Sequence, residues 1–374
     1  MGDGPSTLEK LGLTMGQRIG RRVEPDPSFW KGRSVLVTGH TGFKGGWLAL
    51  WLSSMGAKVH GYALSPPTSP SFFESTRLKD GLESSTLGDI RDLSFLLKSM
   101  TPAKPSVVFH LAAQRLVRDS YLSPVETFST NLMGTINLLE AARSSGEVQA
   151  IVNVTTDKCY ENKEWLWPYR ETDNLGGHDP YSSSKACAEI ATAAYRKCFL
   201  AEAGIQVATA RAGNVIGGGD WAKDRLIPDY FRAADRGEPL RIRSPNAVRP
   251  WQHVLEPLAG YLLLAEKLVT EGSPFAEAWN FAPEDSDAKP VSWIVDRLCE
   301  SIPNGKWEHD VGSHAHEAAL LRLDNSKAKA NLRWLPRWSL PTALEKTIEW
   351  HRHWKAGESM ADVTSRQIQS YQAA

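Results

Sequence analysis

The 374-residue sequence is poor in cysteine, has no excess of either charge and contains no long hydrophobic run. Its four cysteines are too few for a disulfide scaffold, and they lack the paired close spacing of a zinc site. Basic and acidic residues number 43 each without long runs of one sign, which argues against a nucleic acid or a membrane surface as a partner. We therefore expect a small-molecule ligand, and no metal site is predicted.

The N-terminus lacks the apolar core of a secretion signal, and no run of about 20 apolar residues is present to span a bilayer. These absences favour a cytoplasmic protein with reduced thiols. Residues 1–29 precede the first regular pattern and are expected to form a flexible or loosely docked extension.

The sequence does contain a regular alternation of strand and helix patterns. Residues 34–38 (SVLVT) form a valine-rich apolar run, typical of a parallel strand covered on both faces. The segment from Phe43 to Met55 has a broad apolar face of helical character, and Gly56 stands where a helix would end. Further strands are predicted over 58–64, 107–112, 150–155 and 206–210, with helices over 94–100, 124–143 and 181–203. This alternation predicts an α/β fold with a doubly wound parallel sheet.

A glycine-rich turn, TGHTGFKG, follows the first predicted strand directly and opens the first helix. Gly39, Gly42 and Gly45 fall three residues apart in it, interleaved with Thr41 and the Phe43-Lys44 pair. A tight turn and a close backbone approach exclude side chains, and free N–H groups at a helix start attract a pyrophosphate. In this context the turn predicts a site for a nicotinamide dinucleotide.

The end of the second strand makes the choice between NAD and NADP less clear. An acidic residue about 20 positions after the glycines normally binds the adenosine ribose, but the sequence there reads Tyr62-Ala63-Leu64-Ser65. Ser65 offers one hydrogen bond, and no basic residue follows at once to bind a 2'-phosphate. NAD is favoured, and NADP remains the alternative.

The length of the chain favours two lobes rather than one. Residues 30–212 carry the alternating elements and are expected to form a dinucleotide-binding Rossmann domain, to which the chain returns near residues 248–284. Beyond this domain the pattern loosens, glycine and proline cluster, and tryptophans gather toward the C-terminus. We expect residues 213–374 to form mainly a smaller, substrate-binding lobe.

Tyr181 and Lys185 are four residues apart in YSSSKACAE, which places them on one face of a predicted helix. A phenol whose pKa is ordinarily about 10 must become more acidic to accept a proton from a hydroxyl group near neutral pH. A nearby lysine cation and a bound nicotinamide cation both favour the phenolate. The pair therefore predicts a catalytic role, although such pairs also occur on solvated helices.

A second polar cluster follows the predicted strand at 150–155, at the edge where doubly wound sheets place their chemistry. Thr156 offers a hydroxyl for the reacting oxygen beside Tyr181, and Asp157 and Lys158 form an acid/base couple. The alternative is a strand-end loop with ordinary solvated charges. Either member of the couple can be the acid, because this depends on opposite pKa shifts that burial or neighbouring charges would produce.

Five segments together resemble the CDP-glucose 4,6-dehydratases, a branch of the extended short-chain dehydrogenase/reductase family. They are TGHTGFKG, HLAAQRLVRDSY, TTDKCYEN, YSSSKACAE and RAGNVIGGGDWAKDRLIPD, and the resemblance runs from about residue 29 to about residue 350. Lys158 is discriminating, since related dehydratases of dTDP- and GDP-sugars carry glutamate there, and so are His40 and Lys44 in the glycine turn. The residues before 30 and the charged tail after Met360 depart from the family.

The resemblance implies roles for individual residues. It makes Thr156, Tyr181 and Lys185 the short-chain triad, with Asp157 and Lys158 as the additional dehydratase pair. It also implies further cofactor contacts at Asp89, Ile90, Leu111, Ala112, Ala113, Gln114, Asn131 and Thr155. Substrate contacts are implied at Gln114, Asn214, Arg225 and Arg249.

The reaction implied is the conversion of CDP-glucose to CDP-4-keto-6-deoxyglucose and water. Tyr181 would take the proton of the 4-hydroxyl as a hydride passes from C4 to NAD, water would be eliminated across C5 and C6, and the hydride would return to C6. Alternatives are another nucleotide-sugar 4,6-dehydratase, a 4-epimerase, or a non-catalytic dinucleotide-binding regulator. The family also implies a homodimer in which the helices at 124–143 and 181–203 form a four-helix bundle with their counterparts.

Overall fold

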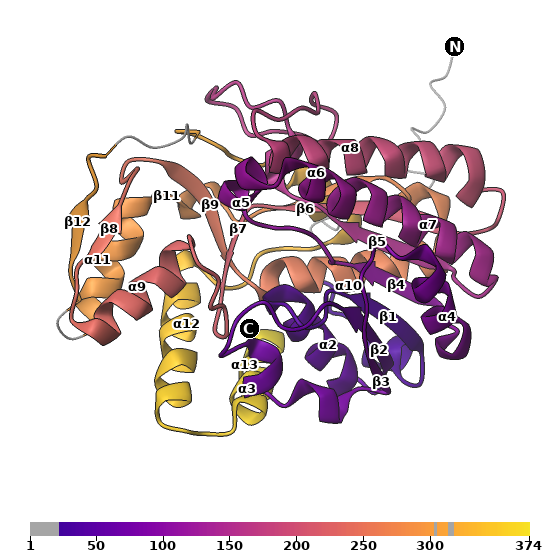
Figure 1. Ribbon diagram of the computed structural model, residues 1–374, viewed down its shortest axis with the longest axis horizontal. Coiled ribbons are helices and arrows are strands. Elements are labelled where there is room, and N and C mark those ends of the chain that lie inside the picture. The colour runs from indigo at the N-terminus through magenta and orange to yellow at the C-terminus, as the bar shows by residue number, and fades with distance from the viewer. Residues whose placement is uncertain (1–21, 303–304, 313–317) are drawn as a thin grey trace, which may run out of the picture.

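The computed structural model describes residues 22–302, 305–312 and 318–374. Its centre is a seven-stranded sheet in the order β10-β6-β5-β4-β1-β2-β3 in which every pair of neighbours is parallel. The strands are β1 (Ser34–Thr38), β2 (Lys58–Ala63), β3 (Ser84–Leu87), β4 (Val107–His110), β5 (Ala150–Val154), β6 (Gln206–Ala212) and β10 (Ala278–Phe281). The predicted doubly wound fold is confirmed, and Figure 1 shows helices on both faces of the sheet.

Alternate residues of each strand point to opposite faces, so each strand contributes to two hydrophobic cores. Val35 and Val37 of β1 belong to the larger core, whereas Leu36 between them belongs to the second. The first face is covered by α2 (Phe43–Ser54), α10 (Leu255–Thr270) and α13 (Met360–Gln372). The opposite face is covered by α4 (Leu93–Ala103), α7 (Gly134–Ser145) and α8 (Pro180–Tyr195). A sheet covered on both faces explains why its strands read as continuous apolar runs.

A second, smaller group of elements lies beside the carboxyl ends of the strands and has its own core (Figure 1). Its strands are β7 (Asn214–Ile216), β9 (Val248–His253) and β11 (Ala288–Pro290) in one small sheet, and β8 (Leu240–Ile242) with β12 (Trp307–His309) in another. Its helices are α9 (Leu226–Arg236), α11 (Val291–Ser301) and α12 (Leu340–Lys355). Between β9 and β11 the chain returns to the main sheet and forms β10, which pairs with β6.

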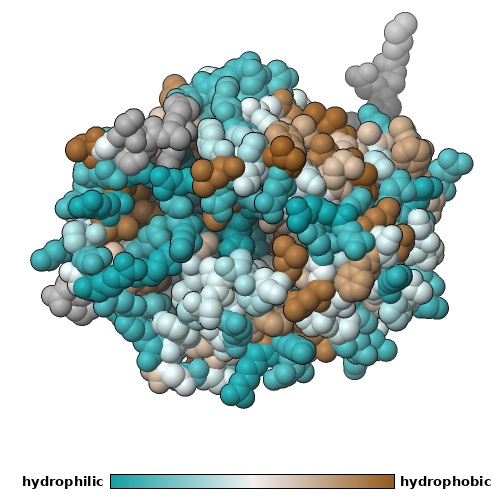
Figure 2. All heavy atoms as spheres, viewed as in Figure 1, coloured by the Kyte–Doolittle hydropathy of each residue, from teal (hydrophilic) through white to brown (hydrophobic). Residues whose placement is uncertain are grey.

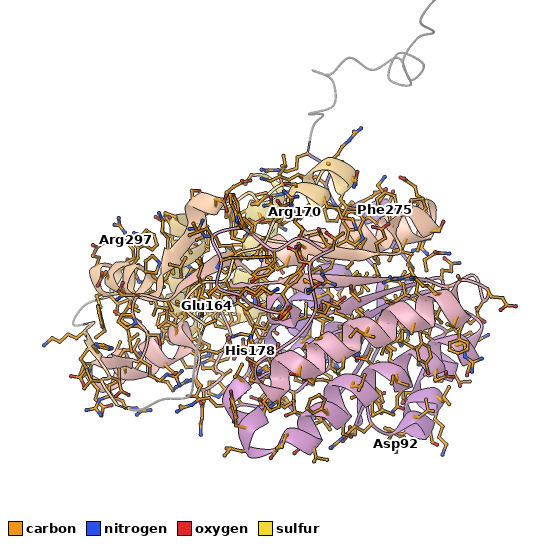
Figure 3. All side chains as sticks on the ribbon, turned by 90° about the horizontal axis from the view of Figure 1, so that it is seen from above. Asp92, Glu164, Arg170, His178, Phe275 and Arg297 are labelled. Carbon is orange, nitrogen blue, oxygen red and sulfur yellow. The ribbon has the colours of Figure 1, made fainter. Side chains whose placement is uncertain are left out.

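Short helices and π-helical turns connect the main elements. The short helices are α1 (Pro27–Trp30), α3 (Phe72–Ser75), α5 (Val117–Leu122) and α6 (Pro124–Phe128). The helix predicted over 124–143 is α6, a π-helical turn (Ser129–Met133) and α7 in succession, and α8 is continued by a second π-helical turn (Arg196–Leu200). In Figure 3, α7 and α8 run side by side along one flank.

The described residues at both ends of the chain pack against the main core. Residues 1–21 of the predicted N-terminal extension lie outside the described residues, but Val23 N donates to Arg333 O and Trp30 is fully buried. At the other end, α13 is formed by Met360–Gln372. No helix in the described ranges is both long and apolar enough to cross a bilayer.

Tyr371 fastens α13 to the rest of the protein. Its hydroxyl donates to Glu256 Oε2 at 2.8 Å, and its ring packs edge-on against Trp51 and Trp338. Glu256 is fully buried and also accepts the backbone N–H groups of Arg337 and Trp338. The tail is therefore an integral part of the core.

We expect Tyr371→Phe to lower the free energy of unfolding by about 1–3 kcal/mol, because it removes a donor from a buried carboxylate while keeping the ring. Urea denaturation of both proteins measures the change. Tyr121→Phe is the control, since Tyr121 is exposed and should change stability little. Equal stability of the Tyr371→Phe variant and the parent would contradict the role given to this hydroxyl.

Candidate active site

The glycine turn joins β1 to α2 and brings three backbone segments into close contact. Gly39 has φ +77°, and a Cβ there would lie 2.8 Å from Ala112 N. A Cβ on Gly45 would lie 2.2 Å from the carbonyl oxygen of Gly39. Gly42 is the N-cap of α2 and provides no capping side chain, so the N–H groups of the first turn are available to a ligand. The turn therefore fits a dinucleotide pyrophosphate.

The residues predicted for the adenosine end lie at the carboxyl ends of β2 and β3. Ser65 is exposed just beyond β2. Asp89 follows β3, and its carboxylate pairs with the Arg91 guanidinium, with the Asp89 Oδ2 to Arg91 Nη2 distance at 2.5 Å. Ile90 is buried and fills the space left by Gly134, where a Cβ would lie 2.6 Å from Ile90 Cγ2. Asp89 and Arg91 border a shallow depression of the surface.

The loop after β4 is held by Thr38 and Asn131. The N–H groups of Leu111 and Ala112 donate to Thr38 Oγ1 at 3.1 and 3.2 Å. Asn131, in the first π-helical turn, accepts from Gln114 N at 2.8 Å and donates to Gln114 O at 3.0 Å. The Gln114 side chain bonds to the backbone of Leu116 in its own loop and donates to Thr127 Oγ1 on α6.

Asn131 also connects this loop to the candidate catalytic helix. Its Nδ2 atom donates to Ser184 Oγ on α8 at 2.9 Å. Asn131 lies in the π-helical turn Ser129–Met133, and such turns within helices are frequent at functional sites. Ala113 lies between the loop's fixed ends and is half-buried.

Tyr181 and Lys185 lie one turn apart on α8 and are both buried. The helix begins after Asp179, whose carboxylate accepts the Ser182 N–H at 2.9 Å. Lys185 Nζ donates to the Val154 carbonyl oxygen at 3.2 Å, at the end of β5. The first turn of α8 and the end of β5 thus meet at this edge of the sheet.

Burial shifts both of these candidate catalytic groups toward their neutral forms. It raises the pKa of Tyr181 to about 12, although a hydrogen bond with Thr156 and the charge of Arg225 oppose this. It lowers the pKa of Lys185 to about 8. The more acidic phenol predicted from the sequence is therefore not a property of these protein groups alone, because burial outweighs the cations that face Tyr181.

Thr156, Asp157 and Lys158 follow β5 and face the start of α8. Thr156 caps the short 3-10 turn Asp157–Cys159, and its hydroxyl donates to Asp157 Oδ1 at 3.0 Å. Burial raises the pKa of the Asp157 carboxyl, although the charge of Lys158 opposes this. Asp157 Oδ2 is buried without a hydrogen-bond partner among the described residues, and a Cβ on Gly213 would lie only 3.2 Å from it. Asp157 thus has one carboxyl oxygen without a hydrogen-bond partner among the described residues, and burial shifts the carboxyl group toward its protonated form.

Several cations from other elements face this centre. Burial lowers the pKa of Lys44 to about 8, with further contributions from Arg225 and Lys185, while Asp157 opposes the shift. Lys44, predicted as a cofactor contact, therefore also lies within electrostatic reach of the acid/base couple. Arg249, on β9, stabilises the carboxylate form of Asp157 as well and donates to the Val248 and Ala319 carbonyl oxygens.

The loop between β7 and α9 carries Arg225 and a partner that sequence reasoning missed. Arg225 Nη1 donates to Asp220 Oδ2 at 2.7 Å. The loop packs closely on α12, because a Cβ on Gly218 would lie 2.0 Å from the Trp350 ring. Asn214 lies at the start of β7, opposite Trp251 of β9. The GGGD sequence was a visible signal for Asp220, since three glycines in a row imply a tightly packed loop.

Sequence reasoning also missed Glu189 and Arg211, which form a buried ion pair beneath the catalytic residues. Thr155, predicted as a cofactor contact, is directed into this pair and donates to Glu189 Oε1 at 2.5 Å. Figure 2 shows hydrophilic side chains within a hollow near the centre of the same face of the molecule that Figure 1 presents.

Comparison with known proteins now assigns the chain to a family. Residues 36–347 match the family described as GDP-mannose 4,6 dehydratase. The chain belongs to this family. A CDP-glucose 4,6-dehydratase of Salmonella typhimurium is 52% identical over 355 residues, which cover 93% of this chain and 99% of the relative. A dTDP-glucose 4,6-dehydratase of the same organism is 26% identical over 70% of this chain and 77% of the relative.

Solved structures show the same fold. A UDP-glucose 4-epimerase of Thermotoga maritima, determined with UDP-glucose, matches with a TM-score of 0.75 and 25% identity, covering 87% of this chain and 99% of that one. The protein MoeE5, determined with UDP-glucose and NAD, matches with a TM-score of 0.71 and 25% identity, covering 86% and 99%. The resemblance inferred from the sequence motifs is confirmed by the match to the family and by the 52% identical relative.

We expect Gly45→Ala to abolish stable dinucleotide binding, because its Cβ would lie 2.2 Å from Gly39 O and would displace the turn. Isothermal titration with NAD measures the loss. Gly81→Ala is the matched control, since a Cβ there meets nothing within 4 Å. Unchanged NAD affinity in Gly45→Ala would show that the ligand does not depend on this turn.

Proposed function

We propose that this protein is a CDP-glucose 4,6-dehydratase that uses NAD and releases CDP-4-keto-6-deoxyglucose and water. The observation that carries the proposal is the second acid/base couple beside Tyr181 and Lys185. A 4-epimerase needs only the redox pair, whereas elimination of water also needs a group to remove the C5 proton and another to protonate the leaving hydroxyl. The 52% identical relative supports both the reaction and the cytidine nucleotide.

The glycine turn and the loop after β4 are suited to bind NAD across the carboxyl ends of β1 and β4. When bound there, NAD would supply the reversible hydride acceptor that oxidation at C4 and reduction at C6 of the sugar require. The first turn of α2 offers N–H groups to the pyrophosphate. Ser65, Asp89 and Ile90 are the proposed contacts at the adenosine end, and Asn131 fixes the loop 111–114 against α8.

In the oxidation step Tyr181 Oη is the proposed acceptor of the proton from the 4-hydroxyl. Thr156 lies beside the phenol and donates its own proton to Asp157 Oδ1, while the charge of Arg225 favours the ionised form of Tyr181. Lys185, tied to the Val154 carbonyl oxygen, adds a second positive charge one turn away. Because burial alone keeps the phenol neutral, proton removal depends on positive charge assembled around it.

In the elimination step Asp157 is the proposed acid and Lys158 the proposed base. Asp157 Oδ1 accepts from Thr156, which leaves Oδ2 to carry the proton and deliver it to the departing 6-hydroxyl. Burial raises the pKa of the Asp157 carboxyl, which favours the acid form that this role requires. Lys158, the next residue along the 3-10 turn, then removes the C5 proton that the 4-ketone has made acidic.

A panel of nucleotide sugars tests the function directly. Purified protein is incubated with CDP-, dTDP-, UDP- and GDP-glucose and with GDP-mannose, and the products are identified by NMR. We expect a 4-keto-6-deoxy sugar from CDP-glucose. A C4 epimer would support the epimerase alternative. Turnover of another nucleotide sugar but not of CDP-glucose would contradict the proposed cytidine nucleotide.

Asp157→Asn should retain C4 oxidation but slow elimination by roughly 100-fold or more, as expected when a general acid is lost. Oxidation is followed by the near-ultraviolet absorbance of the reduced dinucleotide and elimination by product release. In the parent, elimination should fall as the pH rises through the raised pKa of Asp157, because the acid form is lost. Asp80→Asn, at an exposed position of the short 3-10 helix Leu78–Gly81, is the control.

A homodimer is proposed through the flank formed by α5 to α8. Its outer surface exposes apolar side chains, and Leu122 and Val125 are each 82% exposed. Met133, Ile190 and Phe199 continue this apolar surface along the helices and the second π-helical turn. Exposed apolar residues gathered on neighbouring helices are typical of a protein interface, and a second copy of the chain offers a matching surface related by twofold symmetry.

The double variant Leu122→Asp/Val125→Asp should convert the dimer to a monomer, because it places two carboxylates in the apolar interface. Light scattering coupled to gel filtration measures the mass. Val311→Asp, at a site that is 85% exposed and away from these helices, is the control. A parent protein that is already monomeric at micromolar concentration would refute the proposed dimer.

We also propose a cytoplasmic location, and we propose that the two groups of elements bind different ligands. Residues 30–212, with the return near 248–284, would bind the dinucleotide, and residues 213–374 would mainly bind the nucleotide sugar. The pairing of β10 with β6 supports the return of the chain to the first domain.

A further inference from the structure

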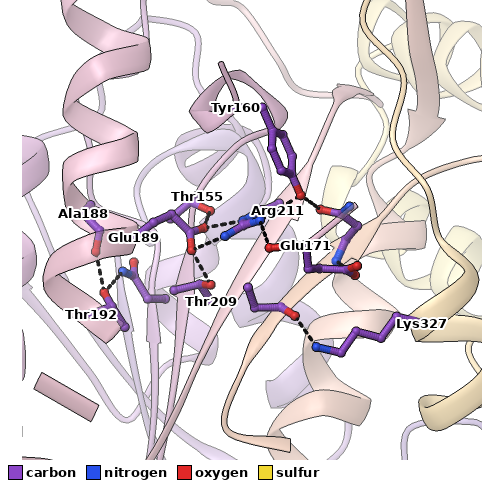
Figure 4. A network of polar contacts seen from close by, with 12 residues as sticks. Thr155, Tyr160, Glu171, Ala188, Glu189, Thr192, Thr209, Arg211 and Lys327 are labelled. Carbon is purple, nitrogen blue, oxygen red and sulfur yellow. Dashed lines mark hydrogen bonds and ion pairs between the residues drawn. The ribbon is translucent and has the colours of Figure 1, made fainter. Parts of the chain in front are cut away.

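Beneath the proposed active site, Glu189 and Arg211 form an ion pair that is almost fully buried. Both side chains are only 3% exposed. Arg211 Nε donates to Glu189 Oε1 at 2.9 Å, and Arg211 Nη2 donates to Glu189 Oε2 at 2.8 Å. This two-point contact, drawn in Figure 4, joins α8 to β6 with a defined geometry.

The Glu189 carboxylate is satisfied by two further donors. Thr155 Oγ1 donates to Oε1 at 2.5 Å, and Thr209 Oγ1 donates to Oε2 at 2.6 Å. Burial pushes the pKa of Glu189 upward, but Arg211 and the hydrogen bonds together keep it below its usual value. Glu189 is therefore a fixed negative charge inside the protein.

The ion pair contacts the segment after β5 at two positions, Thr155 through Glu189 and Tyr160 through the Arg211 guanidinium. Arg211 Nη1 donates to Tyr160 Oη at 2.8 Å, and Tyr160 Oη donates to Asn280 Oδ1 at 2.7 Å. The guanidinium also lies over the Tyr160 ring, 4.9 Å from its centroid. Thr155 and Tyr160 bracket Thr156, Asp157 and Lys158, so the ion pair holds both sides of this catalytic segment.

The pair also meets the catalytic helix, because Tyr181, Lys185 and Glu189 are spaced by four residues on one face of α8. Glu189 lies one turn beyond Lys185 and favours its protonated form. Other ionisable groups facing Lys185 are Cys159 beside the catalytic segment, His110 on β4 and Lys44 on α2. Glu189 is the carboxylate among these neighbours.

We propose that Glu189 and Arg211 are positioning residues that hold the redox pair on α8 and the acid/base couple after β5 in one geometry. Neither residue touches substrate in this account. Glu189 binds both the strand end that leads to Thr156 and the helix that carries Tyr181, whereas Arg211 binds Tyr160 beyond Lys158. This inference rests on the proposed function, since it concerns how the two half-reactions share one site.

Two isosteric variants separate positioning from ordinary stabilisation. Thr155→Val and Thr209→Val each remove one hydroxyl from the same carboxylate, but only Thr155 is adjacent to the catalytic segment. We expect Thr155→Val to lower kcat about 10-fold with KM within twofold, because small displacements of catalytic groups cost rate steeply. Thr209→Val should keep kcat within threefold at a comparable loss of stability, measured by thermal unfolding.

Tyr160→Phe provides an independent test of the Arg211 side of the pair. It keeps the ring and removes the hydroxyl that accepts from Arg211. We expect elimination to slow more than C4 oxidation, because Tyr160 is anchored next to the Asp157–Cys159 turn and not to Tyr181. Equal slowing of both steps, or no change in either, would contradict this assignment.

Glu189→Gln tests the electrostatic part, using the full-length protein with NAD present. Loss of the negative charge should move the alkaline limb of the C4 oxidation rate to lower pH, because the protonated form of Lys185 loses its carboxylate neighbour. If this variant does not fold, the two threonine variants and Tyr160→Phe decide the proposal. Equal kcat losses in Thr155→Val and Thr209→Val would overturn it and leave a purely structural ion pair.

If the parent protein does not convert CDP-glucose, the proposed function is refuted instead. That outcome is distinguishable, because it concerns the parent protein and not the ratio between its variants. The positioning proposal is tested only by those ratios and by the pH profile.

Discussion

The proposed active site consists of several ionisable groups that are buried at one edge of a parallel sheet. Tyr181, Lys185 and Asp157 are all removed from water, and burial favours the neutral form of each. Such groups remain in place only if the surrounding charges and hydrogen bonds are themselves fixed. Glu189 with Arg211, and Asp220 with Arg225, provide these fixed charges below and beside the site.

This electrostatic arrangement also explains why the acid/base couple distinguishes the proposed reaction from epimerisation. An epimerase would gain nothing from a carboxyl group that is buried with one free oxygen next to Tyr181. A dehydratase needs such a group, since the departing hydroxyl requires a proton in a site closed to water. The environment of Asp157 therefore supports the proposal that this residue is the acid, a choice that the sequence alone left open.

Local signals were enough to predict five strands of the main sheet, the helices α2, α4 and α6 to α8, and the glycine turn. The valine-rich run of β1 and the spacing of Tyr181 and Lys185 are properties of short segments. β3 was missed because Ser84–Leu87 is polar, and α13 was missed because its stabilising contact is with Glu256, far away in the chain. Glu189 and Arg211 were missed for the same reason, since an ion pair across 22 residues leaves no periodic pattern.

The most direct test of the account is the fate of deuterium placed at C4 of CDP-glucose, followed by NMR of the product. An enzyme that oxidises C4, eliminates water and returns the same hydride yields a 4-keto-6-deoxy sugar with the deuterium at C6 and a solvent-derived hydrogen at C5. Deuterium retained at C4 of an epimerised sugar, or found at no position of the product, would contradict it.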